Sequence, residues 1–147
     1  MTPDVNVLVA ASRRDHAHHG TAHGWLTQAL AECVSGAGPS LTLMGTVVAS
    51  YLRLVTHPKI FKEPTPMAHA LAFADTLLAC AGVNWLATDS EWPALRQLCA
   101  ERGLAGNDVP DAWIAATTLN HNEVLVTFDR DFLRLLPDRH LQLLPVA

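Results

Sequence analysis

Two aspartates lie at the ends of predicted elements, where an open parallel sheet commonly has its binding site. Asp129 follows the apolar run 124–128 almost directly, and Asp111 opens the helix expected before that run. Ligands of an open parallel α/β sheet bind beyond the carboxyl ends of its strands, so both acids are candidates for a site. Each also has a purely structural explanation. Asp129 fits a polar turn residue, and Asp111 fits an acid that faces the positive end of a helix dipole.

A cluster of carboxylates at one sheet edge would mean more than either acid alone. Like charges brought together raise one another's pKa values and cost stability unless a cation compensates. Oxygen ligands favour magnesium or manganese over softer metals. Nucleophilic catalysis has no comparable support, since no serine stands in a GxSxG setting and no cysteine has a motif around it. If the acids cluster, any hydrolysis at that edge would rest on a bound metal.

The composition indicates one acidic domain. The chain has 147 residues, 50% of them apolar, which is enough for one continuous core, and we expect a single domain over 1–147. The formal net charge of −4 argues against broad electrostatic binding of nucleic acid, so any RNA contact must be local. The three cysteines form no CxxC pair, which fits a reducing cytoplasm, and no apolar run is long enough to span a membrane.

The elements expected around these acids alternate between helices and strands. Helices are predicted over 16–32, 47–55, 66–80, 91–102 and 109–121, with a short helical turn at 131–136. Strands are predicted over 83–88, 123–127 and 141–144. The apolar run 5–11 fits a buried strand or a buried helix equally well. Such alternation implies a parallel sheet covered by helices on both faces.

Capping residues predict where several of these helices begin and end. Thr65, Ser90 and Asp108 are expected N-caps, because their side chains can accept hydrogen bonds from free backbone amides. Gly103 is expected to end the helix 91–102.

Four histidines in one short segment suggest zinc as an alternative metal. They stand at 16, 18, 19 and 23, and His19 and His23 would share one face of a helix. A zinc site needs a third ligand at a matching spacing, which is missing here. We therefore interpret this segment as a polar, exposed helix.

Four segments resemble PIN-domain ribonucleases of the VapC toxin type and occur in that family's order. They are PDVNVLVA (3–10), YLRLVTHPKIF (51–61), VPDAWIAA (109–116) and LVTFDRDF (125–132). The resemblance implies a PIN-like three-layer α/β/α sandwich with a central, mostly parallel sheet. It also implies that Asp4 ends the central first strand and that 5–11 is helical.

The family pattern assigns roles to particular side chains of this sequence. It carries over onto Asp4, Asp111 and Asp129 as the catalytic acids, which would bind Mg²⁺, with Mn²⁺ as the alternative ion. Asn6 matches a polar position beside the first acid, and Thr127 matches one that orients the last acid. Both would support the metal ligands without binding the ion.

Ser50 departs from the family pattern. Family members commonly have a glutamate just before the segment that begins here at Tyr51. A serine hydroxyl can hold a metal-bound water, but it supplies no negative charge and no base near neutral pH. Asp108 is the nearest substitute for the missing carboxylate by sequence, and Asp131 is a poorer one.

Three basic residues are candidates for contacting phosphate. They are Arg53, Lys59 and Lys62, which stand in or just after the second matching segment. Solvated surface charge is the alternative explanation for each of them.

The resemblance implies a function and partners. It implies a Mg²⁺-dependent endoribonuclease toxin of a type II toxin–antitoxin system, which hydrolyses RNA phosphodiester bonds in tRNA or another structured RNA. A VapB-type antitoxin would hold it in check, and it would form a homodimer in the cytoplasm. The alternative, motivated by Ser50, is a catalytically weakened PIN domain that binds RNA or an antitoxin without cutting. Metal-dependent cleavage distinguishes the two.

Overall fold

Short parallel strands form the centre of the fold. The computed structural model describes residues 1–88 and 90–146. One group of strands has the order β1–β4–β5, and a second pair is β2–β3, with every pairing parallel. The bounds are β1 Thr2–Pro3, β2 Leu41–Met44, β3 Val83–Leu86, β4 Leu125–Thr127 and β5 Leu141–Leu143.

The two groups of strands meet between β1 and β2. The backbone N–H of Thr42 donates to the carbonyl of Met1 at 2.9 Å, which places β2 beside β1. The spatial order is therefore β3–β2–β1–β4–β5, and β1 lies at the centre although it has only two residues. Pro3 is level with Val126 of β4, so the residues that follow both strands emerge at the same edge.

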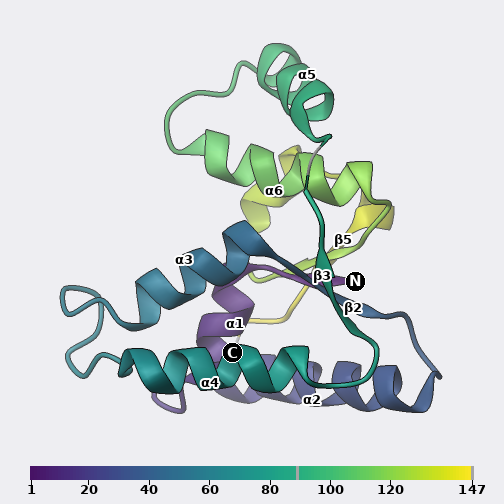
Figure 1. Cartoon of the computed structure of the whole chain (residues 1–147). Coiled ribbons are helices and arrows are strands. Elements are labelled where there is room, and N and C mark those ends of the chain that lie inside the picture. Colours follow the sequence, from purple (N-terminus) through teal and green to yellow (C-terminus); the bar gives the residue numbers. More distant parts are fainter. Residues whose placement is uncertain (89, 147) are drawn as a thin grey trace.

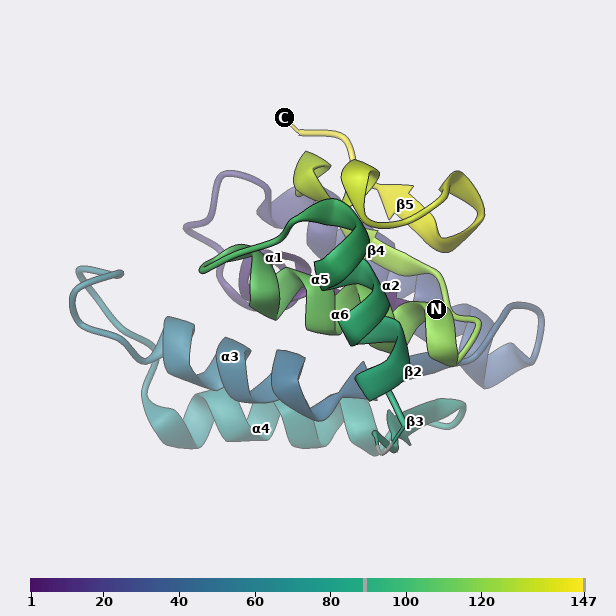
Figure 2. The ribbon, with the colours of Figure 1, turned by 90° about the horizontal axis from the view of Figure 1, so that it is seen from above.

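Helices cover both sides of these strands. In Figure 1, α5 and α6 lie on one side of the strands and α1, α2 and α4 on the other, while Figure 2 shows α3 and α4 side by side. The helices are α1 Val5–Ser12, α2 His19–Ser35, α3 Gly45–Val55, α4 Met67–Leu78, α5 Trp92–Arg102 and α6 Asp108–Asn120, with 3₁₀ turns η1 Arg130–Arg134 and η2 Asp138–His140. The predicted α/β sandwich with a parallel sheet is confirmed.

The helix α1 explains why the run 5–11 was ambiguous by sequence. Its residues 7–11 are all buried, so the helix has no polar stripe that would reveal a 3.6-residue period. Asp4 precedes it in an extended conformation and caps it, because the Asp4 carboxylate accepts a hydrogen bond from the backbone N–H of Val5. The helical alternative is therefore correct, and the side chain of Asp4 is fixed at the start of the helix.

Several local predictions are wrong. The strand β2 was not expected, and α3 begins directly after it at Gly45. Neither Thr65 nor Ser90 caps a helix, since Pro66 and Glu91 hold those positions without a side-chain cap bond. Asp108 is the first residue of α6 and Asn107 is its N-cap. The C-cap prediction at the end of α5 is confirmed, because Gly103 adopts the left-handed conformation there.

Among the described residues, no helix is long and apolar enough to cross a membrane.

Gly82 is a position where the fold requires glycine. Its φ is +82°, and a Cβ built there would lie 2.9 Å from Cys33 Cβ and 3.0 Å from the Cys33 carbonyl oxygen. Gly103 also has a positive φ of +61° but has no atom within 4 Å of such a Cβ. Comparing substitutions at these two positions therefore distinguishes the cost of backbone strain from the cost of a steric clash.

We predict that Gly82→Ala costs more stability than Gly103→Ala. The left-handed conformation costs an alanine roughly 1–2 kcal/mol at either site, and the clash with Cys33 adds about 1–3 kcal/mol at Gly82 alone. Urea unfolding of both variants measures the difference. Equal losses at the two sites would show that the contact with Cys33 is relieved without cost.

Candidate functional site

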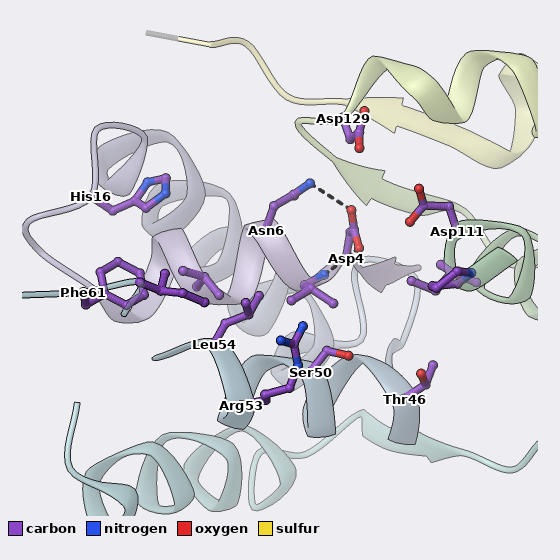
Figure 3. A pocket seen from close by; sticks show the side chains of 15 residues that line it. Asp4, Asn6, His16, Thr46, Ser50, Arg53, Leu54, Phe61, Asp111 and Asp129 are labelled. Carbon is purple, nitrogen blue, oxygen red and sulfur yellow. Dashed lines mark hydrogen bonds between the residues drawn. The ribbon is translucent and has the colours of Figure 1, made fainter. Parts of the chain in front are cut away.

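One pocket gathers the three acids predicted as metal ligands. It has a volume of about 460 Å³ and is lined by Asp4 after β1, Asp111 in the first turn of α6, and Asp129 after β4 (Figure 3). These residues are far apart in the sequence, and the parallel strands bring two of them to one edge. The fold therefore places the predicted acids around a common space.

Asp4 is held by hydrogen bonds on both carboxylate oxygens. Its Oδ1 accepts from the backbone N–H of Val5 at 2.6 Å. Its Oδ2 accepts from the Thr127 hydroxyl at 2.6 Å and from the Asn6 side-chain amide at 2.9 Å. The carboxylate is therefore fixed in orientation although it lies at the junction of a strand and a helix.

Thr127 and Asn6 tie Asp4 to the segment that carries Asp129. The buried Thr127 hydroxyl, while donating to Asp4, accepts from the Asn6 amide at 2.9 Å and from the backbone N–H of Asp129 at 3.0 Å. The side-chain Oδ1 of Asn6 accepts from the backbone N–H of Phe128 at 3.2 Å. Asn6 therefore lies beside the first acid, while the Thr127 hydroxyl donates to the first acid and contacts the last one only through its backbone amide.

Burial and repulsion disfavour negative charge on two of the acids. Burial raises the pKa of Asp4 to about 6, and the charges of Asp111 and Asp129 add to the shift, while hydrogen bonds from Thr127 and Val5 oppose it. Burial also raises the pKa of Asp111, with further contributions from Asp129 and Asp131. Positive charge in the pocket would relieve this cost.

The donor set of the pocket suits magnesium. Magnesium prefers oxygen ligands and is commonly held by one or two carboxylates, with water and substrate phosphate completing its shell. Within the ranges 1–88 and 90–146, no three His, Cys, Asp or Glu side chains are grouped closely enough to hold one ion together. Two of the three acids with water would be a sufficient set, so the residues present fit this ion.

Ser50 lines the same pocket from α3. The carboxylate that the family resemblance leads us to expect is therefore absent from the pocket itself. Neither candidate substitute lines this pocket. Asp108 instead forms an ion pair with Arg134 at 2.5 Å, which lowers the pKa of its carboxyl. Asp131 is exposed, and its backbone N–H donates to Asp129.

Of the three candidate phosphate contacts, Arg53 lines the pocket and the two lysines do not. Lys59 and Lys62 are exposed in the segment between α3 and α4. Sequence reasoning missed His16, which also lines the pocket. The sequence predicts an exposed helix from residue 16, but α2 begins only at His19, and His16 lies in the turn before it. No local pattern in the sequence marks that placement.

The family of the chain follows from a comparison with known domains. Residues 1–135 match the family model of the PIN domain, and the chain belongs to this family.

Curated relatives with similar sequences are VapC ribonucleases. Ribonuclease VapC31 of Mycobacterium tuberculosis is 38% identical over 142 residues, and Ribonuclease VapC25 of the same organism is 39% identical over 143 residues. Each alignment covers 95% of this chain and 95% of the relative. The resemblance to PIN-domain ribonucleases of the VapC type is thereby confirmed.

Solved structures show the same fold at low sequence identity. VapBC2 from Rickettsia felis, bound to a DNA fragment from its promoter, superposes with a TM-score of 0.66 at 19% identity, covering 98% of both chains. VapC20 of Mycobacterium tuberculosis, described as a sarcin–ricin loop cleaving toxin, gives 0.61 at 19% identity, covering 90% of this chain and 92% of that one. Both support the PIN-like architecture.

The raised pKa of Asp4 predicts that Asp4→Asn stabilises the metal-free protein at pH 7. The folded protein binds more protons than the unfolded chain between pH 3.8 and about 6, so ionisation of Asp4 removes stability as the pH rises through this window. A shift of this size corresponds to roughly 3 kcal/mol at most. Urea unfolding in EDTA should show the gain at pH 7 and none below pH 3.8.

The matched control for this prediction is Asp75→Asn, which removes an exposed carboxylate on α4. It should leave the free energy of unfolding nearly unchanged. Magnesium should also stabilise the native protein more than Asp4→Asn. A gain in Asp4→Asn that does not vary with pH would contradict the electrostatic explanation.

Thr127→Val should lower stability and raise the pKa of Asp4 further. It removes the donor to Asp4 and the acceptor for Asn6 and the Asp129 amide, at a cost of about 1–3 kcal/mol for buried groups left unpaired. Thr127→Ser keeps the hydroxyl and should lose much less stability. Carboxyl NMR titration and urea unfolding measure the two effects, and equal behaviour of Val and Ser would refute the role of the hydroxyl.

Proposed function

We propose that the chain is a Mg²⁺-dependent endoribonuclease that hydrolyses RNA phosphodiester bonds at the pocket lined by Asp4, Asp111 and Asp129. The observation that carries this proposal is the gathering of three carboxylates in one pocket where burial and repulsion raise the pKa values of Asp4 and Asp111. Such an arrangement costs stability unless a cation is bound. The names of the curated relatives support ribonuclease activity. Mn²⁺ is the alternative ion.

The residues of the pocket would have different roles at such a site. Magnesium supplies Lewis acidity that activates water and positive charge that offsets the charge of the phosphate. Asp4, Asp111 and Asp129 would supply the carboxylate ligands, two of them with water being enough for one ion. Thr127 and Asn6 fix the orientation of Asp4. The Thr127 hydroxyl also accepts from the backbone N–H of Asp129, which fixes the backbone at the last acid. Arg53 places a positive charge in the same pocket for the phosphate.

The biological role that we propose is that of a toxin in a type II toxin–antitoxin system. A VapB-type antitoxin would inhibit the nuclease, as the VapBC2 complex of Rickettsia felis suggests by its name. The substrate would be tRNA or another structured RNA, and VapC20 is itself described as acting on the sarcin–ricin loop. The toxin would act in the cytoplasm as a homodimer.

A second candidate function rests on Ser50. This hydroxyl lines the pocket where relatives of the VapC type commonly carry a glutamate, and neither Asp108 nor Asp131 lines the pocket in compensation. The alternative is a PIN domain with weakened catalysis that binds RNA or an antitoxin without cutting.

Cleavage of total bacterial RNA by the purified protein tests the first proposal. We expect cutting with magnesium or manganese and none with EDTA. Asp4→Asn should lower the rate by about 100-fold or more, since even the outer partners of metal ligands are worth 10–100-fold. Asp75→Asn is the control, because it removes one exposed carboxylate of the same type that does not line the pocket, and it should cut at the native rate.

Ser50→Glu separates the two candidate functions. If the native protein cuts RNA, the added carboxylate should leave the cleavage rate unchanged or increase it. If the native protein cuts no RNA and Ser50→Glu does, the chain is the weakened PIN domain. Cutting that survives in EDTA or in Asp4→Asn would refute the metal-dependent site.

A further inference from the structure

The pocket extends well beyond the acids. At the end far from Asp111 it is lined by His16 and Phe61, with Leu54 beneath them, and Arg53 lies between the two ends (Figure 3). This second end contains no carboxylate among the described lining residues. The pocket therefore has an acidic end and a mainly apolar end, separated by one positive charge.

His16 presents a defined hydrogen-bond donor at the apolar end. The backbone N–H of His18 donates to His16 Nδ1 at 3.1 Å. Because a backbone amide can only donate, Nδ1 is the acceptor, and the neutral ring carries its proton on Nε2. Burial lowers the pKa of His16, and the neighbouring His18 lowers it further, so the neutral form is favoured. Nε2–H of this half-buried ring is left as the group that can donate to a ligand.

The turn that carries His16 is held in place from both sides. The His16 backbone N–H donates to the Arg13 carbonyl at 3.1 Å, and its own carbonyl accepts from His19 at 3.0 Å. The ring of His18 stacks on Phe128 with centroids 4.9 Å apart, and Phe128 directly precedes Asp129. The donor is therefore fixed relative to the acids at the other end of the pocket.

Phe61 is an apolar wall whose position is also fixed. The guanidinium carbon of Arg13 lies 3.8 Å from the centre of the Phe61 ring. Arg13 is buried and bonds Asp15, the Thr65 hydroxyl and the Glu63 carbonyl, which ties the segment between α3 and α4 to the end of α1. Ile60 and Leu54 extend the same wall.

We propose that this end of the pocket is a nucleobase subsite for an unpaired nucleotide beside the scissile phosphate. The base packs against Leu54, Ile60 and Phe61 and accepts a hydrogen bond from His16 Nε2, while Arg53 meets the phosphate. The inference rests on the proposed function and names the part of the RNA that the pocket reads. Sequence-specific proteins mostly read RNA through unpaired bases, and a volume of about 460 Å³ lies in the usual range of ligand pockets.

The chemistry of the walls favours a nucleotide over other occupants. A base is flat and largely apolar on its faces but carries acceptors on its edge, which matches an apolar wall with one donor. Its phosphate matches Arg53 and a cation held by the acids. A carboxylate or a bare phosphate would use Arg53 but would leave the apolar wall without a partner.

Binding of mononucleotides tests the subsite without requiring cleavage. The probes are AMP, GMP, CMP, UMP and ribose 5-phosphate, titrated in magnesium and followed by NMR, including the ring signals of His16. We expect at least one nucleotide to bind about 10-fold more tightly than ribose 5-phosphate, since stacking and a donor together are worth at least that factor. The His16 signals should shift with each nucleotide that binds more tightly and should not shift with ribose 5-phosphate.

Variants assign this preference to its residues. His16→Ala should weaken nucleotide binding by about 5-fold, the worth of one hydrogen bond, and leave ribose 5-phosphate binding unchanged. His16→Gln keeps a donor and should retain part of the preference. Arg53→Ala should weaken both ligands. His23→Ala, which removes an exposed histidine on α2, is the matched control and should change neither.

The proposal is overturned if no nucleotide binds more tightly than ribose 5-phosphate, or if His16→Ala weakens both equally. Metal-dependent RNA cleavage could still be observed alongside either result. In that case the nuclease proposal would stand, and this pocket would not be the site that recognises a base. Base preference without any cleavage would instead support the subsite and count against the nuclease. The two proposals therefore fail in distinguishable ways.

Discussion

The hydrogen bond from the Thr127 hydroxyl to Asp4 is the contact on which the rest of the site depends. It joins the end of β4 to the end of β1 across 123 positions of sequence, in a fully buried setting. The same hydroxyl accepts from Asn6 and from the amide of Asp129, so one oxygen positions the first acid and the start of the segment that carries the last. It also opposes the rise in the pKa of Asp4 caused by burial and by like charge. The side chains of the pocket are thus organised by contacts within the chain itself.

That organisation has a cost in stability which the rest of the fold must offset. Asp4 is buried with two other acids nearby, whereas an uncharged residue there would be more favourable for folding alone. The offset comes from the apolar packing around it, since α1 is buried along residues 7–11 and every strand beside Asp4 is lined by buried side chains. A site of high negative charge can persist because the core beneath it is continuous.

Much of this arrangement could be predicted from sequence, and the failures have physical reasons. The acids 111 and 129 stood at element ends, where the end of an apolar run is informative, whereas Asp4 needed the family resemblance because two residues are too few to reveal a strand. The strand β2 is also short and draws its stability from pairing with β3, which no local pattern expresses. Ser90 and Asp108 failed as caps because their side chains bond Asn120 and Arg134 in the folded chain. His16 was missed for a similar reason, since its place is set by a turn packed on Phe128 and Arg13.

The central position of β1 has a consequence for how the chain folds. Its parallel partner β4 begins only at Leu125, so their pairing must close a loop of most of the chain, whereas the contacts of α3 with α4 and of α5 with α6 are local and can form early. Bringing Asp4 and Asp129 together therefore carries the loop-closure entropy of most of the chain. During synthesis the pocket cannot form until residue 129 has left the ribosome, so any chemistry that needs both acids must wait for the segment that follows β4.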